Sequence, residues 1–224
     1  MVGTAAHPPK PHPPKPHWRG LLHQWAAFVA ALAGVPLVVA VAVRRGTGAA
    51  IATSIYAVTV IALFGVSATY HRGTWTPKAR VRMRRLDHSM IFVFIAGTFT
   101  ALSVLALRPS TARMILLIVW SGAMLGLVLS LEILPAPRWL NVVVYLSLGW
   151  VAVLVVPELE RRAGAAVLVL VAVGGALYTL GAIAYGTKRP DPSPLVFGYH
   201  EVFHLCTILA AICHYTAIWL AVYA

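Results

Sequence analysis

The chain has 224 residues, of which 60% are hydrophobic and only 11% are charged, and its mean hydropathy is +0.82. Because soluble domains carry about 25% charged residues, this composition excludes an ordinary soluble protein and indicates an all-α integral membrane protein. The net charge of +12 would suit a nucleic-acid partner, but the basic residues lie in short segments between apolar runs. That arrangement argues against nucleic acid and fits anionic lipid at the membrane surface.

The chain divides into a tail and a membrane domain. Residues 1–19 are rich in proline, histidine and lysine, so they are expected to form an extended, disordered cytoplasmic tail. Its histidines His7, His12 and His17 recur at a spacing of five, which allows a metal-binding tail, although a solvated basic tail is the ordinary interpretation. Residues 20–224 are expected to form one transmembrane domain.

Seven apolar runs follow the tail, and each is near the roughly 20 residues that a helix needs to cross a bilayer core. The sequence therefore predicts a seven-transmembrane helix bundle. A basic loop over residues 72–85 is expected to separate the second span from the third. The expected helices cover residues 21–43, 49–70, 87–107, 113–131, 139–156, 164–185 and 196–223.

The distribution of lysine and arginine predicts the orientation of these spans. With the N-terminus in the cytoplasm, twelve basic residues fall in inside segments and six in outside loops. Cytoplasmic loops carry the excess of positive charge in membrane proteins. We therefore expect a cytoplasmic N-terminus and a C-terminus outside.

Two histidines, His200 and His204, lie four residues apart at the start of the last predicted span. This spacing puts both imidazoles on one face of a helix, one turn apart, where two rings can bind one metal ion. Polar groups inside a membrane are costly unless they have partners, so the pair is a candidate functional site. Hydrogen bonds to neighbouring helices are the alternative.

The predicted topology brings more polar residues to the same depth, because the second span ends at His71 and the third begins at Asp87. Three imidazoles and one open position are the ligands of a catalytic zinc, which lowers the pKa of its bound water toward ~7. Asp87 is then a fourth ligand, or an acceptor that orients this water and takes its proton. Ser67, one turn before His71, would hydrogen-bond the water or a substrate carbonyl, or else its own helix backbone.

Three further histidines are expected outside the ligand set. His88 points about 100° away from Asp87 on a helix, which indicates an interfacial or supporting role. His214 lies ten residues beyond His204, about 15 Å deeper, where a buried, hydrogen-bonded histidine is the simplest interpretation. His23 lies at the level of the site and is a candidate supporting group.

Several of these segments together resemble the progestin and adipoQ receptor family, and most closely its bacterial branch of hemolysin III, or TrhA-like, proteins. They are S-A-T-Y-H ending at His71, L-D-H-S-M-I around Asp87 with I-A-G-T-F-T after it, and H-E-V-F-H from His200 to His204. The resemblance implies seven helices in the bacterial plasma membrane and a zinc ion near the cytoplasmic face. It implies His71, His200 and His204 as ligands, with Asp87 holding the zinc water.

The resemblance also bears on activity, because the adiponectin receptors of animals are linked to ceramide hydrolysis. It makes the chain a candidate zinc-dependent hydrolase of a lipid amide or ester. Family members often have proline directly after the I-A-G-T-F-T segment, where this chain has Ala101, so the resemblance does not extend to a proline kink in that helix.

Three other interpretations compete with a hydrolase. H-E-x-x-H matches a metalloprotease with Glu201 as general base, but no acidic residue follows Glu201 to serve as a later ligand. A haem-binding cytochrome would need histidines on facing helices. The third is a receptor or pore-forming protein with a structural zinc and no catalysis, which a closed four-ligand site would favour.

Overall fold

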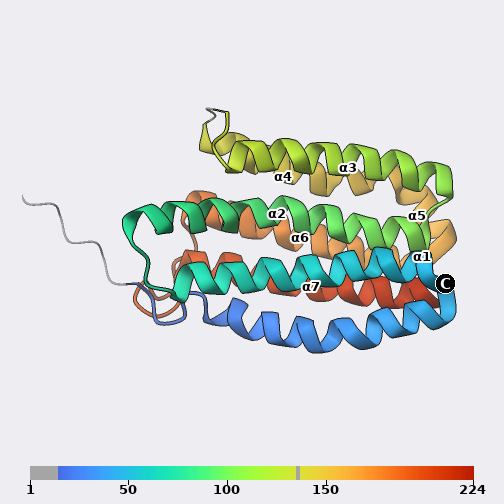
Figure 1. The fold of residues 1–224 in the computed structure, drawn as a ribbon, viewed down its shortest axis with the longest axis horizontal. Helices are drawn as coiled ribbons and strands as arrows, with labels where there is room; N and C mark the ends of the chain where they lie inside the picture. Colours follow the sequence, from blue (N-terminus) through green and yellow to red (C-terminus); the bar gives the residue numbers. More distant parts are fainter. Residues whose placement is uncertain (1–14, 135–136) are drawn as a thin grey trace, which may run out of the picture.

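The structure, a computed structural model, describes residues 15–134 and 137–224. Over these residues the regular structure is helical, apart from one isolated β-bridge between Ser193 and Phe197 (Figure 1). The expected all-α fold is therefore confirmed. The elements are α1 (Leu21–Arg72), α2 (Pro77–Ala106), α3 (Pro109–Ser130), α4 (Arg138–Trp150), the 3-10 helix η1 (Val151–Val155), α5 (Val156–Ala163), α6 (Ala165–Thr187) and α7 (Tyr199–Tyr223).

The first helix, α1, is a hairpin of two arms. It has 52 residues, and only Gly46 has non-helical dihedral angles, with φ 82° and ψ 178°. A positive φ of this kind is open to glycine at little cost. Figure 1 shows the ribbon turning back at this point, so that the two arms run side by side. Contacts centred near Gly46 set their register, with His23 against Ser67 and Gly34 against Ala57.

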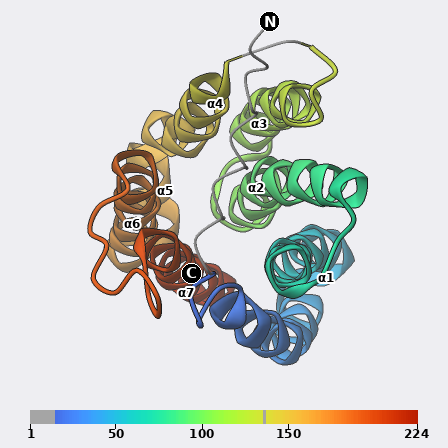
Figure 2. The ribbon, with the colours of Figure 1, turned by 90° about the vertical axis from the view of Figure 1, so that its left-hand side faces the viewer.

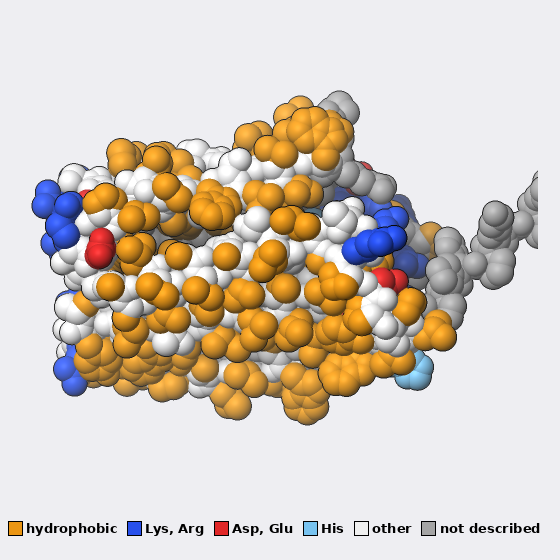
Figure 3. Space-filling view, turned by 180° about the vertical axis from the view of Figure 1, so that it is seen from behind, with side chains coloured by type: hydrophobic (Ala, Val, Ile, Leu, Met, Phe, Trp, Pro, Cys, Tyr) orange, Lys and Arg blue, Asp and Glu red, His pale blue; other side chains and the backbone are white. Residues whose placement is uncertain are grey.

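Six helical stretches in the described part of the chain are long and apolar enough to cross a membrane. They are α1, α2, α3, the stretch Trp139–Ala163, α6 and α7. Large apolar side chains such as Leu32, Leu117 and Leu154 are exposed on their outer faces. In Figure 3 apolar side chains cover the middle of the molecule and Lys and Arg gather at its two ends. This distribution is that of a membrane protein.

Two element boundaries differ from those predicted. The segment expected as a basic loop up to residue 85 is largely helical, because Thr76 caps α2 by accepting from the Ala79 N–H and Pro77 occupies the first turn. Asp87 consequently lies well inside α2 and not at its start. The predicted fifth span is divided into α4, η1 and α5, and Pro157 sits in the first turn of α5, where proline is tolerated.

The helices form a ring in which neighbours in sequence are neighbours in space, and α7 closes it against α1 (Figure 2). Small residues allow close approach between helices, as is usual in membranes. A Cβ atom added to Gly97 would lie 2.1 Å from the Thr59 hydroxyl, and one added to Gly126 would lie 2.2 Å from the Phe92 ring. At the end away from the histidines, Arg45 donates to the carbonyls of Leu105 and Ala221, which stabilises the C-terminal ends of α2 and α7.

The end of the predicted tail packs against the loop that precedes α7. The backbone N–H groups of His17 and Trp18 donate to the carbonyls of Leu195 and Val196 at 3.1 and 3.2 Å. The Trp18 ring meets the Phe197 ring edge to face. His7 and His12 lie outside the described residues, so the idea of a metal-binding tail remains a prediction.

Candidate metal centre

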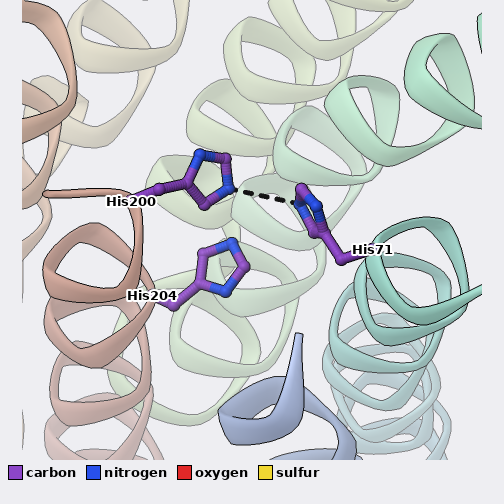
Figure 4. Close-up of side chains that lie close together, drawn as sticks. All are labelled: His71, His200 and His204. Atoms are coloured by element: carbon purple, nitrogen blue, oxygen red, sulfur yellow. Dashed lines mark hydrogen bonds between the residues drawn. The ribbon is translucent and has the colours of Figure 1, made fainter. Parts of the chain in front are cut away.

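Three histidines from two helices converge at one end of the bundle. His71 lies in the last turn of α1, and His200 and His204 lie in the first two turns of α7. Because the arms of α1 fold back at Gly46, the end of this helix lies beside the start of α7. The three imidazoles point toward one another (Figure 4), and one ligand nitrogen from each lies within 4.8 Å of the other two.

One of the nitrogen–nitrogen distances in this group is the distance expected at a tetrahedral zinc site. Two nitrogens bound at about 2.0–2.1 Å to a tetrahedral zinc lie about 3.3 Å apart, and Nε2 of His71 lies 3.2 Å from Nε2 of His200. His204 is buried, and the other two rings are partly buried. The cluster can therefore hold a metal; a hydrogen bond between the two rings is the other use of the same contact.

His23, from the first arm of α1, packs against the histidine cluster. Its ring stacks on that of His204 with centroids 3.8 Å apart and an angle of 9° between the planes. Its Nδ1 lies 2.8 Å from the Ser67 hydroxyl. His23 and Ser67 are both buried, with 3% of each exposed. Ser67 is thus hydrogen-bonded to the His23 side chain from the other arm of α1. The alternative from sequence was a bond to its own helix backbone.

Asp87 lies near the cluster without belonging to it. Its side chain lines the same cavity as Ser67, His200 and His204. Among the described residues the close metal-binding group consists of the three histidines alone. Asp87 is therefore not part of the group that could hold a metal ion, and its role as a fourth ligand or as a proton acceptor stays a prediction.

Glu201, the candidate base of the protease interpretation, is engaged elsewhere. It is fully buried, and one carboxylate oxygen accepts from Arg19 at 2.5 Å. The other oxygen accepts from the backbone N–H of Gly198 at 2.9 Å, which caps the start of α7. Glu201 thus fixes the helix that carries His200 and His204.

A cavity of about 750 Å³ runs from the cluster into the bundle. Near the histidines its wall includes Ser67, Asp87 and Tyr185, and deeper in the bundle it is lined largely by apolar side chains from α2, α4 and α6. Its size suits a drug-sized molecule or a lipid chain. The site thus combines a polar end and an apolar interior.

The remaining predicted residues lie around this centre. His88 places Nδ1 2.6 Å from the Arg84 carbonyl, one turn earlier in α2. His214 is remote from the cluster and places Nε2 3.4 Å from the Val171 carbonyl, in line with the expected structural role.

Two residues near the cluster were not predicted from the sequence. Arg19 could have been suspected as a charge just before an apolar run, whereas nothing in the sequence singled out Tyr185, whose ring meets that of His200 edge to face.

Comparison with known proteins supports the resemblance inferred from the motifs. The model of the family described as haemolysin-III related matches residues 12–215. The chain is 30% identical to the Hemolysin-3 homolog of Bacillus subtilis (strain 168) over 151 residues, which cover 67% of this chain and 68% of that protein. It is 29% identical to Hemolysin-3 of Bacillus cereus over 164 residues, which cover 72% of this chain and 71% of that protein. The chain therefore belongs to the haemolysin-III related family.

Proposed function

We propose that the chain is a zinc-dependent hydrolase of a membrane lipid amide or ester. The observation that carries this proposal is that His200 and His204, two of the three clustered histidines, line the polar end of a cavity with an apolar interior. His71, His200 and His204 would hold the ion. When bound, zinc supplies a Lewis acid for a carbonyl and a water of lowered pKa.

The surrounding side chains have roles that follow from their contacts. Asp87, beside the cluster on the cavity wall, accepts a proton from the attacking water and later gives it to the leaving nitrogen or oxygen. The water oxygen bonds to the carbonyl carbon, and the bond to the leaving group breaks, so the products are an acid and an amine or alcohol. Ser67, held by His23, donates to the carbonyl oxygen or orients Asp87. The apolar part of the cavity takes the acyl chain.

The proposed membrane arrangement has seven spans, with the histidine cluster at the cytoplasmic side of a bacterial plasma membrane. Each arm of α1 is then one span, since half of its 52 residues exceeds the length that a bilayer core needs. The end that carries the cluster also carries the more numerous basic residues, which favours the cytoplasm. Anionic lipid is the expected neighbour of those residues.

Metal analysis of the purified protein tests the site first. The wild type is expected to contain about one zinc per chain, and His200→Ala with His204→Ala to contain none. Equal zinc in the two proteins would remove the site. Hydrolysis is then measured on a panel of lipid amides and esters, with Asp87→Ala as the control; unchanged turnover in that variant would exclude Asp87 from the mechanism.

A second candidate function is membrane disruption or signalling with a structural zinc and no catalysis. The names of the two Bacillus relatives, a hemolysin and a hemolysin homolog, favour it. Release of haemoglobin from erythrocytes by wild type and by Asp87→Ala separates the two functions. Lysis by both proteins, without any lipid hydrolysis, would support the second.

A further inference from the structure

Three basic side chains line the cavity. Arg84, Arg85 and Lys188 all line it at the end that carries the histidines; together they are called the cationic rim below. They come from α2 and from the residue just after α6. Most other basic residues of this end, such as Lys78 and Arg82, are exposed on the outside of α2 and do not line the cavity.

One carboxylate already occupies part of the cationic rim. Glu132 follows α3 and accepts from Arg84 at 3.2 Å through one oxygen and from Arg85 through the other. The hydrogen bond from Arg85 holds the pKa of Glu132 below its ordinary value, so this side chain is an anion at neutral pH. Two guanidinium groups around one anion are the arrangement that recognises carboxylate or phosphate oxygens.

Glu132 is half exposed and has a positive φ of 57°, a backbone conformation that non-glycine residues rarely adopt. The Nε atom of Arg85 is buried without a partner among the described residues. The rim therefore has one donor that Glu132 does not use.

We propose that the cationic rim binds the phosphate of an anionic glycerophospholipid whose acyl chain enters the cavity. The cationic rim, His200 and His204 line the same cavity, so a lipid whose phosphate binds the rim can place its acyl chain in the space that these histidines line.

This assignment rests on the proposed function in one respect only, which is that the ester so placed would be the bond hydrolysed. Binding of the headgroup needs neither the metal nor hydrolysis. The two proposals can therefore fail separately, and the test measures binding.

The test titrates the purified full chain, in a neutral maltoside detergent, with 1-oleoyl lysophosphatidylglycerol and with 1-oleoyl lysophosphatidylcholine, and counts bound lipid by native mass spectrometry. The wild type is expected to bind the anionic lipid at least tenfold more tightly. Arg84→Gln with Arg85→Gln should lose this preference, whereas the control Lys78→Gln with Arg82→Gln, which removes the same charge from the outside of α2, should keep it. Equal affinities in the wild type, or equal losses in both double variants, would overturn the proposal.

Three further measurements guard against misfolding, against a site for free anions and against dependence on the metal ligands. Glu132→Gln removes the competing carboxylate and should bind the anionic lipid several-fold more tightly; weaker binding would contradict the proposal. Inorganic phosphate at the same concentration should not displace the lipid, and displacement would indicate a site for free anions. The variant that combines His200→Ala with His204→Ala should retain the preference for the anionic lipid. This result is expected whether or not the wild type hydrolyses lipid.

Discussion

His23 and His204 stack face to face, with ring centroids 3.8 Å apart and planes 9° from parallel. The two residues are 181 positions apart in sequence, and the stack joins the first arm of α1 to α7 next to the candidate ligands. Each ring carries one buried nitrogen, His23 Nε2 and His204 Nδ1, without a hydrogen-bond partner among the described residues. The contact therefore holds the His204 ring by packing and not by a hydrogen bond.

The first prediction concerns this stack. His23→Ala should weaken zinc binding by about 10- to 100-fold, the usual effect of removing a group that orients a metal ligand. His23→Phe should lose less, because it keeps the aromatic stack, worth about 1 kcal/mol, and removes only the contact with Ser67. Zinc affinity measured by competition with a chelator checks both variants. His214→Ala serves as the control, since it removes a histidine of α7 remote from the cluster; loss of zinc there would point to general damage.

The second prediction concerns removal of the metal. A ligand present at 1,000 times its dissociation constant stabilises the folded state by about 4 kcal/mol, which corresponds to about 10 °C in melting temperature for a chain of this size. Treatment with a chelator should lower the melting temperature of the wild type by this order. His71→Ala should melt at the lower temperature and should not respond to the chelator. A chelator effect of the same size in both proteins would mean that the three histidines do not hold the ion.

The third prediction concerns Arg19 and Glu201. Arg19→Ala leaves the fully buried Glu201 carboxylate without its ionic partner, and loss of one partner of a buried pair costs about 3 kcal/mol. Arg19→Gln combined with Glu201→Gln should be less harmful than Arg19→Ala, because no buried charge is left alone. Melting temperatures of the variants measure the difference. Should Glu201→Gln abolish hydrolysis while the protein melts normally, the role of Glu201 as a helix cap would be wrong.

The sequence predicted the histidine cluster because each of its parts is local or follows from topology. The spacing of His200 and His204 is a property of one helix, and His71 needed only an antiparallel pair of spans that ends at the same depth. The partners of the cluster could not be predicted in this way. The stack of His23 on His204 and the ion pair of Arg19 with Glu201 depend on the exact rotation of α1 and α7, which periodicity does not determine in helices that are apolar on every side.

The boundaries of α2 and of the fifth span were misjudged for a local reason. Thr76 and Pro77 are a helix-start signal, but the run of arginines after them was interpreted as a loop by its charge. The first turns of α2 extend toward the membrane surface, where arginine side chains can reach water and lipid headgroups. Similarly, the fifth span was predicted to end at residue 156, directly before Pro157, although proline in a first turn opens a helix.

The last prediction concerns the number of spans and their orientation. If both arms of α1 cross the membrane, the turn at Gly46 and the loop after α1 lie on opposite sides. Thr47 and Thr74 are exposed at these two places, so each can be replaced by cysteine in a chain whose own Cys206 and Cys213 have been changed to serine. A maleimide that does not cross membranes should label Thr47→Cys in intact cells, and Thr74→Cys only after the cells are opened. Labelling of both positions from outside would show that α1 does not cross twice, whereas the reverse pattern would place the histidine cluster at the outer face and contradict the orientation inferred from the basic residues.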